Sequence, residues 1–188
     1  MAKPAGLLLF HGAGGHKDHR LFIRLETELS IPVRRVNFAY RELGVRRPPP
    51  RAPKLIAEVV QAAESFAADL GVDAKRLVLG GRSMGGRMAS LAVAEGLAAR
   101  SLLLLSYPLH PPGKPENLRV DHFSDIKSRC LFISGDRDPF GSPAEFEAHI
   151  GSISAKVDSV WLAGDAHDPK KNDDLLVSSV SRWLGRLR

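Results

Sequence analysis

The sequence contains a single cysteine, Cys130, among its 188 residues. One cysteine cannot form an internal disulfide, and it lacks the second thiol on which most thiol-based metal sites depend. Long apolar runs are also missing. Residues 7–10 are too few for the apolar region of a signal peptide, and no stretch approaches the length that spans a bilayer. We therefore expect a soluble, unexported protein of the reducing cytoplasm, without a membrane partner.

Aromatic side chains are scarce as well, at 6% of the residues, and the basic residues behind the formal net charge of +6 are spread along the chain. Proteins that bind nucleic acids typically gather basic residues on one surface and add aromatic side chains that stack on bases. We therefore expect no nucleic-acid partner. The one dense basic segment is Arg46-Arg47-Pro48-Pro49-Pro50-Arg51, which its prolines keep out of a helix and which we interpret as a solvated loop.

Apolar residues make up 44% of the chain and recur in short runs. Between the runs lie stretches of helical spacing, such as residues 53–70, where Pro53 suits a first turn and Gly71 an end, and residues 176–187. Strands that alternate with helices form a parallel sheet covered on both faces. We predict one α/β domain over residues 1–188, a three-layer α/β/α sandwich with a mainly parallel six-stranded sheet of residues 7–10, 33–38, 77–79, 102–105, 131–134 and 157–162.

Ser83 lies in the segment Gly81-Arg82-Ser83-Met84-Gly85, between an apolar run and an apparent helix. This strand–turn–helix context is the one that a nucleophile elbow requires. The serine of such a turn has a strained backbone, and we attribute the glycines at 81 and 85 to side chains that would collide across the bend. The N–H of Met84, at the start of the helix, is placed to bind an oxyanion. The segment therefore predicts acyl transfer through Ser83.

The glycine-rich segment His11-Gly12-Ala13-Gly14-Gly15 follows the first predicted strand, at the sheet edge where parallel strands present their loops to a ligand. Amides of such a loop can reach a substrate oxygen. We predict Ala13, with Gly14 as the alternative, as the second oxyanion donor beside Met84. A phosphate-binding loop is the rival interpretation, but the lysine followed by serine or threonine that ends such a loop is missing.

Three histidines, His11, His16 and His19, lie in the same region together with Asp18. Histidine and carboxylate side chains are common metal ligands, so the group is a candidate cluster. We favour another role for His11, namely hydrogen bonds within the loop that shape it. We therefore expect no metal ion and no other cofactor.

An acid and a base are expected after the last two predicted strands. Asp136 and Asp138 both follow residues 131–134, and we choose Asp138 because Pro139 biases it toward an extended conformation along the sheet edge. Asp136 is the alternative. His167, on the loop before the last helix, is the predicted general base.

The other histidines fit the role of base less well. His110 also follows a predicted strand, but it precedes Asp138, whereas nucleophile, acid and then histidine is the chain order of this kind of scaffold. We interpret His122 and His149, in helix-like surroundings, as surface residues.

Taken together, four segments resemble the α/β-hydrolase superfamily over nearly the whole chain: residues 11–15, 81–87, 135–139 and 164–167. More narrowly, the Gly-Arg-Ser-Met-Gly-Gly-Arg elbow and the segment from Tyr107 to Pro115 are similar to a small dienelactone-hydrolase-like group. That group is related to the hydrolase-like domain of a subunit of a histone acetyltransferase complex. The resemblance implies a minimal hydrolase fold without a cap domain and a triad of Ser83, Asp138 and His167.

Without a cap, the pocket is expected to be shallow and to favour small acyl groups. We predict a serine hydrolase that cleaves a small ester or thioester through an acyl-enzyme; the alternative is a catalytically quiet binding or scaffold module on the same fold. An acidic substrate is a further hypothesis, because four arginines lie in or near the candidate loops: Arg20, Arg41, Arg82 and Arg137. The sequence indicates no oligomeric state.

Overall fold

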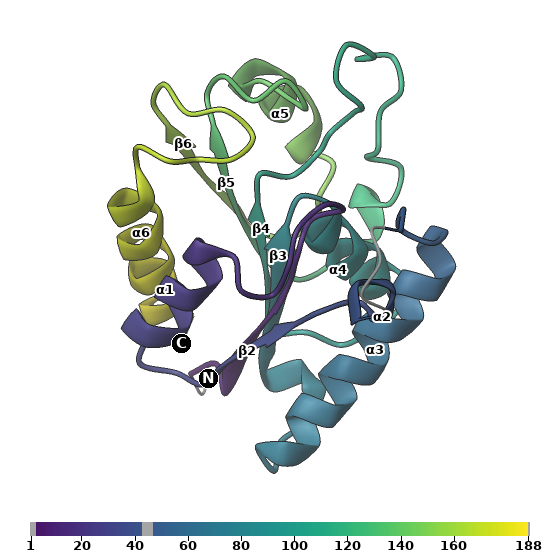
Figure 1. Cartoon of the computed structure of the whole chain (residues 1–188), viewed down its shortest axis with the longest axis vertical. Helices are drawn as coiled ribbons and strands as arrows, with labels where there is room; N and C mark the ends of the chain where they lie inside the picture. The colour runs from purple at the N-terminus through teal and green to yellow at the C-terminus, as the bar shows by residue number, and fades with distance from the viewer. Residues whose placement is uncertain (1–2, 43–46, 188) are drawn as a thin grey trace.

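The computed structural model describes residues 3–42 and 47–187. In this part of the chain six strands form one sheet in the order β2-β1-β3-β4-β5-β6 (Figure 1). All neighbouring strands are parallel, which confirms the predicted sheet. The strands are β1 (Gly6–Phe10), β2 (Val33–Val36), β3 (Leu77–Arg82), β4 (Ser101–Leu105), β5 (Arg129–Gly135) and β6 (Val157–Leu162).

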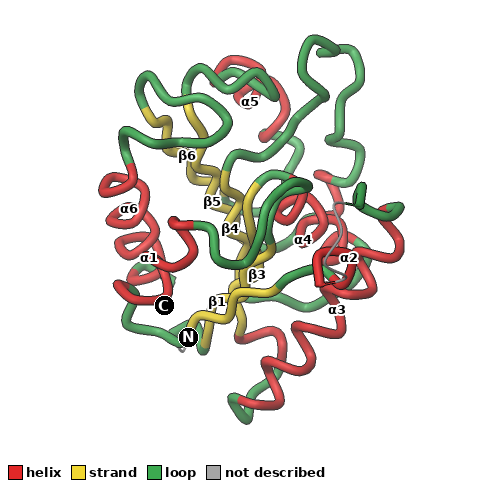
Figure 2. The backbone as a smooth tube through the Cα atoms, in the orientation of Figure 1, coloured by secondary structure: helices red, strands yellow, loops and turns green. Residues whose placement is uncertain are grey.

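Helices cover both faces of the sheet, as the sequence predicts, and Figure 2 shows the resulting layers. One layer contains α1 (Arg20–Glu28) and α6 (Asp173–Gly185). The opposite layer contains α2 (Ala39–Glu42), α3 (Ala52–Asp69), α4 (Met84–Ala94) and α5 (Pro143–Ile150). Two 3₁₀ helices, η1 (Ala74–Arg76) and η2 (Phe123–Asp125), lie in connections. Within the described ranges no segment forms a separate cap over the sheet, and no helix is long and apolar enough to cross a membrane.

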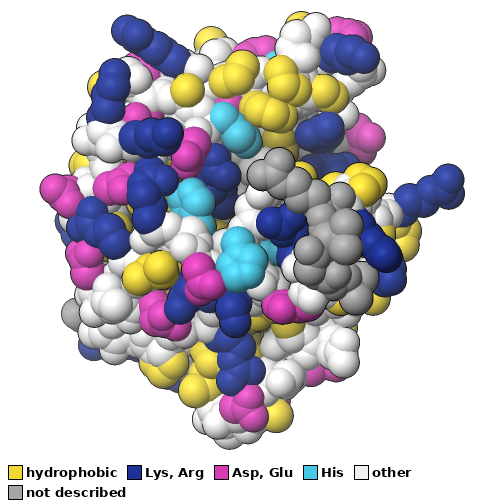
Figure 3. All heavy atoms as spheres, in the orientation of Figure 1, with side chains coloured by type: hydrophobic (Ala, Val, Ile, Leu, Met, Phe, Trp, Pro, Cys, Tyr) yellow, Lys and Arg dark blue, Asp and Glu magenta, His cyan; other side chains and the backbone are white. Residues whose placement is uncertain are grey.

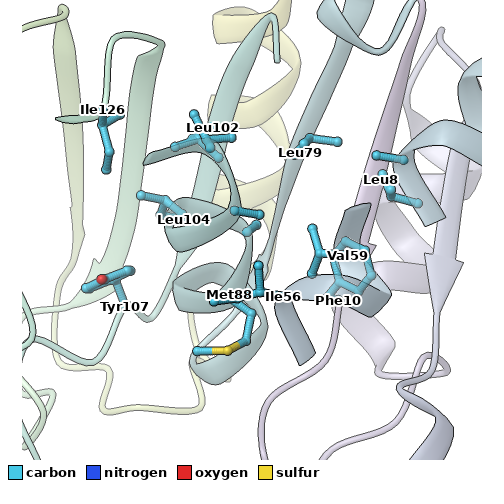
Figure 4. Packing of buried hydrophobic residues seen from close by; sticks show 14 of the residues in the cluster. Leu8, Phe10, Ile56, Val59, Leu79, Met88, Leu102, Leu104, Tyr107 and Ile126 are labelled. Atoms are coloured by element: carbon cyan, nitrogen blue, oxygen red, sulfur yellow. The ribbon is translucent and has the colours of Figure 1, made fainter. Parts of the chain in front are cut away.

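Both faces of the sheet are apolar, because successive residues of a strand point to opposite sides. In β1, Leu8 and Phe10 pack in the cluster with α3 and α4, whereas Leu7 and Leu9 pack in the cluster with α1 and α6. Burial on two sides explains why β1 and β4 are continuous apolar runs rather than alternating ones. Figure 4 shows the first cluster, in which strand side chains lie against those of Ile56, Val59 and Met88.

The predicted boundaries differ from the structure mainly near the site. β2 ends at Val36 rather than at residue 38, because the Phe38 amide turns away to donate a hydrogen bond to His11. β3 continues through two glycines to Arg82, paired with β1 on one side and β4 on the other. In the basic connector, residues 47–51 have no regular structure, and Arg46 lies outside the described residues.

Candidate active site

Ser83 stands at the junction of β3 and α4 with φ 53° and ψ −120°, a left-handed conformation that is strained for a non-glycine residue. Two hydrogen bonds hold it there: its N–H donates to the Leu105 carbonyl at 2.8 Å, and its carbonyl accepts from the Arg87 N–H at 3.0 Å. The structure thus forms the predicted sharp turn, which projects the serine side chain from the end of the strand.

The glycines of the turn are required for a different reason than we expected. A Cβ atom at Gly81 or at Gly85 would overlap the carbonyl oxygen of Phe10, at the end of the neighbouring strand. The collision is therefore with the β1 backbone and not across the bend itself. This close approach brings the loop after β1 against the serine, since a Cβ at Gly12 would lie 3.3 Å from the Cβ of Ser83.

Three side chains predicted from separate segments form one hydrogen-bonded chain. His167 Nε2 lies 2.8 Å from Ser83 Oγ, and His167 Nδ1 lies 2.9 Å and 3.0 Å from the two carboxylate oxygens of Asp138. The Asp138 carboxylate is fully buried, and the imidazole is partly exposed. Asp136, the alternative acid, is exposed and accepts a hydrogen bond from the Gly164 N–H instead. The structure therefore brings Asp138, and not Asp136, to His167.

The imidazole and its carboxylate are held by neighbours that the sequence did not indicate. Phe140 donates its N–H to Asp138 at 2.9 Å and stacks its ring on His167 with 4.0 Å between centroids. Arg82 donates to the His167 carbonyl at 2.9 Å. Buried Asp165 accepts from the Lys170 and Lys171 amides and so shapes the loop that carries His167.

The loop after β1 is arranged to present an amide. The Gly12 carbonyl accepts from His11 Nδ1 at 2.7 Å and from the Gly15 N–H at 2.9 Å. Because the Gly12 carbonyl and the Ala13 N–H belong to one planar trans peptide, fixing the carbonyl points the N–H in the opposite direction. Among the described residues, neither the Ala13 N–H nor the Met84 N–H has an acceptor. The Gly14 N–H is likewise free, and Tyr40 fixes its peptide by donating to the Ala13 carbonyl at 2.7 Å.

The hydrogen bonds of His11 define its protonation. Its Nε2 accepts from the Phe38 N–H at 3.1 Å, so Nδ1 carries the proton that it donates to Gly12. Burial lowers the pKa of His11 and keeps this neutral form at neutral pH. The prediction that His11 shapes the loop is confirmed.

The other histidines have separate partners. His16 contacts Asp18 and Asn37, and His19 contacts Asp168. In the part of the chain that the structure describes, no group of three or more histidine, cysteine or acidic side chains is placed to hold a metal ion.

The remaining histidines lie away from Ser83. His110 is buried and pairs with Glu145 at 3.1 Å. The interpretation of His122 as a surface residue is wrong, because it is half-buried and lies 2.8 Å from Ser90 Oγ. Its place just before η2 looked solvent-facing in the sequence because the helix that covers it, α4, is remote along the chain. His149 is also only partly exposed.

The sequence matches a family described as an alpha/beta hydrolase domain over residues 3–179, nearly the whole chain. The chain belongs to the α/β-hydrolase family. Solved structures show the same fold at low sequence identity. Est1E from Butyrivibrio proteoclasticus is 18% identical with a TM-score of 0.76, over 98% of this chain and 88% of that one.

Two further structures are similar. Dienelactone hydrolase from Anabaena variabilis is 18% identical with a TM-score of 0.76, over 96% of this chain and 86% of that one. Acetyl xylan esterase from Paenibacillus sp. R4 is 14% identical with a TM-score of 0.72, over 98% and 76% of the two chains. At these identities the likeness establishes the fold of this α/β hydrolase and not its substrate.

Ser83 and His167 of this hydrolase line a pocket of about 620 Å³, together with Ala13, Met84 and Phe140. Figure 3 shows histidine side chains near the centre of one face with lysine and arginine side chains around them. Ala13 and Gly14 in the wall are exposed, so the pocket opens to solvent.

The four arginines expected near the site have different environments. Arg20 pairs with Asp168 and Asp173, and Arg82 pairs with Asp168. Arg41 lines a neighbouring hollow, and Arg137 is exposed outside the pocket. The sequence analysis missed two arginines that do line the pocket, Arg87 and Arg119. The spacing of Arg87, one helical turn after Ser83, was the signal that could have identified it.

Proposed function

We propose that this protein is a serine hydrolase that cleaves small esters or thioesters through an acyl-enzyme intermediate. The observation that carries the proposal is the hydrogen-bonded chain from Asp138 through His167 to Ser83, which ends on a strained serine in a pocket of about 620 Å³. Strained backbone and a serine–histidine–carboxylate chain are the parts that acyl transfer requires.

In this mechanism Ser83 Oγ attacks the acyl carbonyl while His167 Nε2 takes the hydroxyl proton. Asp138 accepts the hydrogen bond from Nδ1–H, which leaves Nε2 unprotonated and stabilises the imidazolium that forms. The proton then passes to the leaving alcohol or thiol. Water, activated by the same imidazole, attacks the acyl-enzyme, releases the acid and returns Ser83 to its starting state.

The negative charge that develops on the substrate oxygen is stabilised by the Met84 N–H and the Ala13 N–H. The Gly14 N–H is the alternative to Ala13. The first amide of α4 is suited to this role because it has no acceptor within its own helix and lies at the positive end of the helix dipole. Loss of one such donor typically lowers kcat by about 100- to 1,000-fold.

The names of similar structures support ester chemistry, since they include an acetyl xylan esterase, a dienelactone hydrolase and a structure of Est1E with bound ferulic acid. A pocket of about 620 Å³ without a cap in the described ranges favours short acyl groups. The narrower kinship with the dienelactone-hydrolase-like group belongs to this proposal. The relation to a histone acetyltransferase subunit stays a prediction.

The test is hydrolysis of 4-nitrophenyl esters from acetate to dodecanoate, and of matched thioesters, by the wild type and Ser83→Ala. We expect turnover that is highest for short acyl chains and absent in Ser83→Ala. A preference for long chains would contradict the open-pocket argument. If folded wild-type protein cleaved none of these substrates, the alternative of a binding or scaffold module would replace the hydrolase.

A further inference from the structure

Arg87 and Arg119 line the pocket beside Ser83 without an acidic partner. Arg87 belongs to α4, and Arg119 to the connection between β4 and β5. Both side chains are half-buried. Among the described residues neither guanidinium forms an ion pair or a hydrogen bond, and the buried Nε of Arg87 has no acceptor. Two guanidinium groups therefore line the pocket without a carboxylate, in the described ranges, that forms an ion pair with either of them.

Arg82, in the same wall, has a carboxylate partner that Arg87 and Arg119 do not have within the described part of the chain. Asp168 lies 3.4 Å from Arg82 and 3.3 Å from Arg20, so this carboxylate compensates both cations. The residues outside the described ranges include no aspartate or glutamate that could do the same for Arg87 and Arg119.

The two unpaired arginines are close enough to affect each other. Burial and then the charge of Arg87 lower the pKa of Arg119. Like charges in a partly buried site are unfavourable unless an anion joins them. The backbone of Arg119 is nevertheless fixed, because its N–H donates to the Leu109 carbonyl at 2.7 Å and its carbonyl accepts from the Tyr107 hydroxyl at 3.3 Å. The backbone position that carries the Arg119 side chain is therefore held beside the pocket.

We propose that this pocket selects esters or thioesters whose acyl group ends in a carboxylate, bound by Arg87 and Arg119 while Ser83 attacks the ester carbonyl. A planar guanidinium group can donate two parallel hydrogen bonds to the two oxygens of a carboxylate. Arg87 follows Ser83 by one helical turn, and both side chains line the same pocket of about 620 Å³ together with Arg119, so we expect monoesters of short dicarboxylic acids, which can place the carboxylate and the reacting carbonyl in this one pocket. This inference rests on the proposed serine-hydrolase function. The products of this hydrolysis are the free alcohol or thiol and the dicarboxylate.

The test compares the 4-nitrophenyl monoester of glutaric acid with its neutral methyl diester. We expect wild-type kcat/KM to favour the monoester by about 10-fold or more. In Arg87→Met and Arg119→Met this preference should fall by about 10- to 100-fold, the loss typical of a charge-assisted hydrogen bond. Arg87→Lys should keep part of it, since lysine supplies the charge without the planar guanidinium group. Arg137→Met is the matched control: it removes an equal charge from an exposed position outside the pocket, and the preference should not change.

Equal or faster turnover of the neutral diester by the wild type would overturn the inference, and so would a preference that survives both methionine substitutions. Either result leaves the serine-hydrolase proposal intact. If the wild type cleaves the simple 4-nitrophenyl esters but neither glutarate ester, the inference fails and the serine-hydrolase proposal stands. If it cleaves none of these substrates, the serine-hydrolase proposal fails as well, and binding decides the anion site alone. Monomethyl glutarate should then bind Ser83→Ala, and adding Arg87→Met should weaken it at least 10-fold. No binding, or tighter binding of inorganic phosphate, would contradict a carboxylate site.

Discussion

The protein contains two serine–histidine pairs with the same separation. Ser83 Oγ lies 2.8 Å from His167 Nε2, and Ser90 Oγ lies 2.8 Å from His122 Nε2. Both serines belong to the unit of β3 and α4, seven positions apart: Ser83 lies at the junction and Ser90 within the helix. A distance search would treat them alike, yet their surroundings assign them different roles.

The two pairs differ in the backbone conformation of the serine, in its access to solvent, and at the histidine ring nitrogen that does not contact the serine. Ser90 is fully buried within α4 and donates its proton to the Arg87 carbonyl at 2.9 Å, so its oxygen can only accept from His122. Burial, followed by the charge of Arg87, lowers the pKa of His122 to about 4. Ser83 instead donates toward an imidazole whose Nδ1–H is held by Asp138. A short serine–histidine contact therefore indicates a nucleophile only when the histidine is the acceptor and the serine faces a pocket.

The largest expected difference between the pairs is in turnover. Ser83→Ala should lower ester hydrolysis by more than about 1,000-fold, because it removes the attacking atom. Ser90→Ala should leave kcat within a few-fold and instead lower the free energy of unfolding by about 1–3 kcal/mol, since His122 loses its acceptor. Steady-state kinetics and urea denaturation of both variants separate the two effects. Comparable losses of activity would remove the distinction.

Asp138→Asn should lower kcat by about 1,000- to 10,000-fold. The amide favours the wrong tautomer of His167 and cannot stabilise the imidazolium. Asp136→Asn is the control on the same loop, and we expect it to retain most activity, because its carboxylate contacts the Gly164 amide rather than His167. The opposite ranking of these two variants in kcat would show that the acid is misassigned.

Substitution of His11 tests whether the loop after β1, residues 11–15, holds the Ala13 N–H in place for the oxyanion. His11→Ala should lower kcat by about 10- to 100-fold with a smaller change in KM, because the Gly12 carbonyl loses a donor and the Ala13 N–H loses its fixed direction. In His11→Asn the side-chain amide can replace Nδ1–H, so partial recovery is expected. A merely structural role would leave alanine and asparagine equally active once both are shown to fold.

The smallest effect concerns stability and pH. The folded-state pKa of His122 is about 4, below its usual value of 6.5, so the unfolded state binds the proton more readily. The free energy of unfolding that His122 contributes is complete above pH 6.5 and is lost as the pH falls toward 4. His122→Gln should therefore lose less stability on acidification than the wild type, by an amount on the order of 1 kcal/mol. Urea denaturation at pH 7 and pH 4.5 measures this, and equal losses would contradict it.

The sequence predicted most of the fold because its signals are local. Apolar runs mark β1, β3, β4 and β5, and Pro53 and Gly71 lie near the two ends of α3 as expected. The two edge strands, β2 and β6, mix apolar with charged residues. Ser83, Asp138 and His167 were found because each follows a strand in a parallel sheet, whose carboxyl ends meet at one edge.

Contacts between remote segments could not be predicted in this way. The overlap that excludes side chains at Gly81 and Gly85 involves Phe10, about seventy residues away. The burial of His122 depends on α4, and the compensation of Arg20 and Arg82 depends on Asp168. Charge and hydrogen-bond balance are properties of the assembled pocket, and so Arg87 and Arg119 were missed, whereas Arg20 and Arg82, two of the four arginines chosen, are already paired with carboxylates.

The most direct test of an activated Ser83 is labelling with a fluorophosphonate, read by intact mass and by mapping of the modified peptide. We predict one adduct per wild-type chain, located on Ser83, retained in Ser90→Ala and lost in both Ser83→Ala and His167→Ala. An adduct that persists in folded Ser83→Ala, or no adduct on folded wild-type protein, would contradict the assignment of Ser83 as the nucleophile.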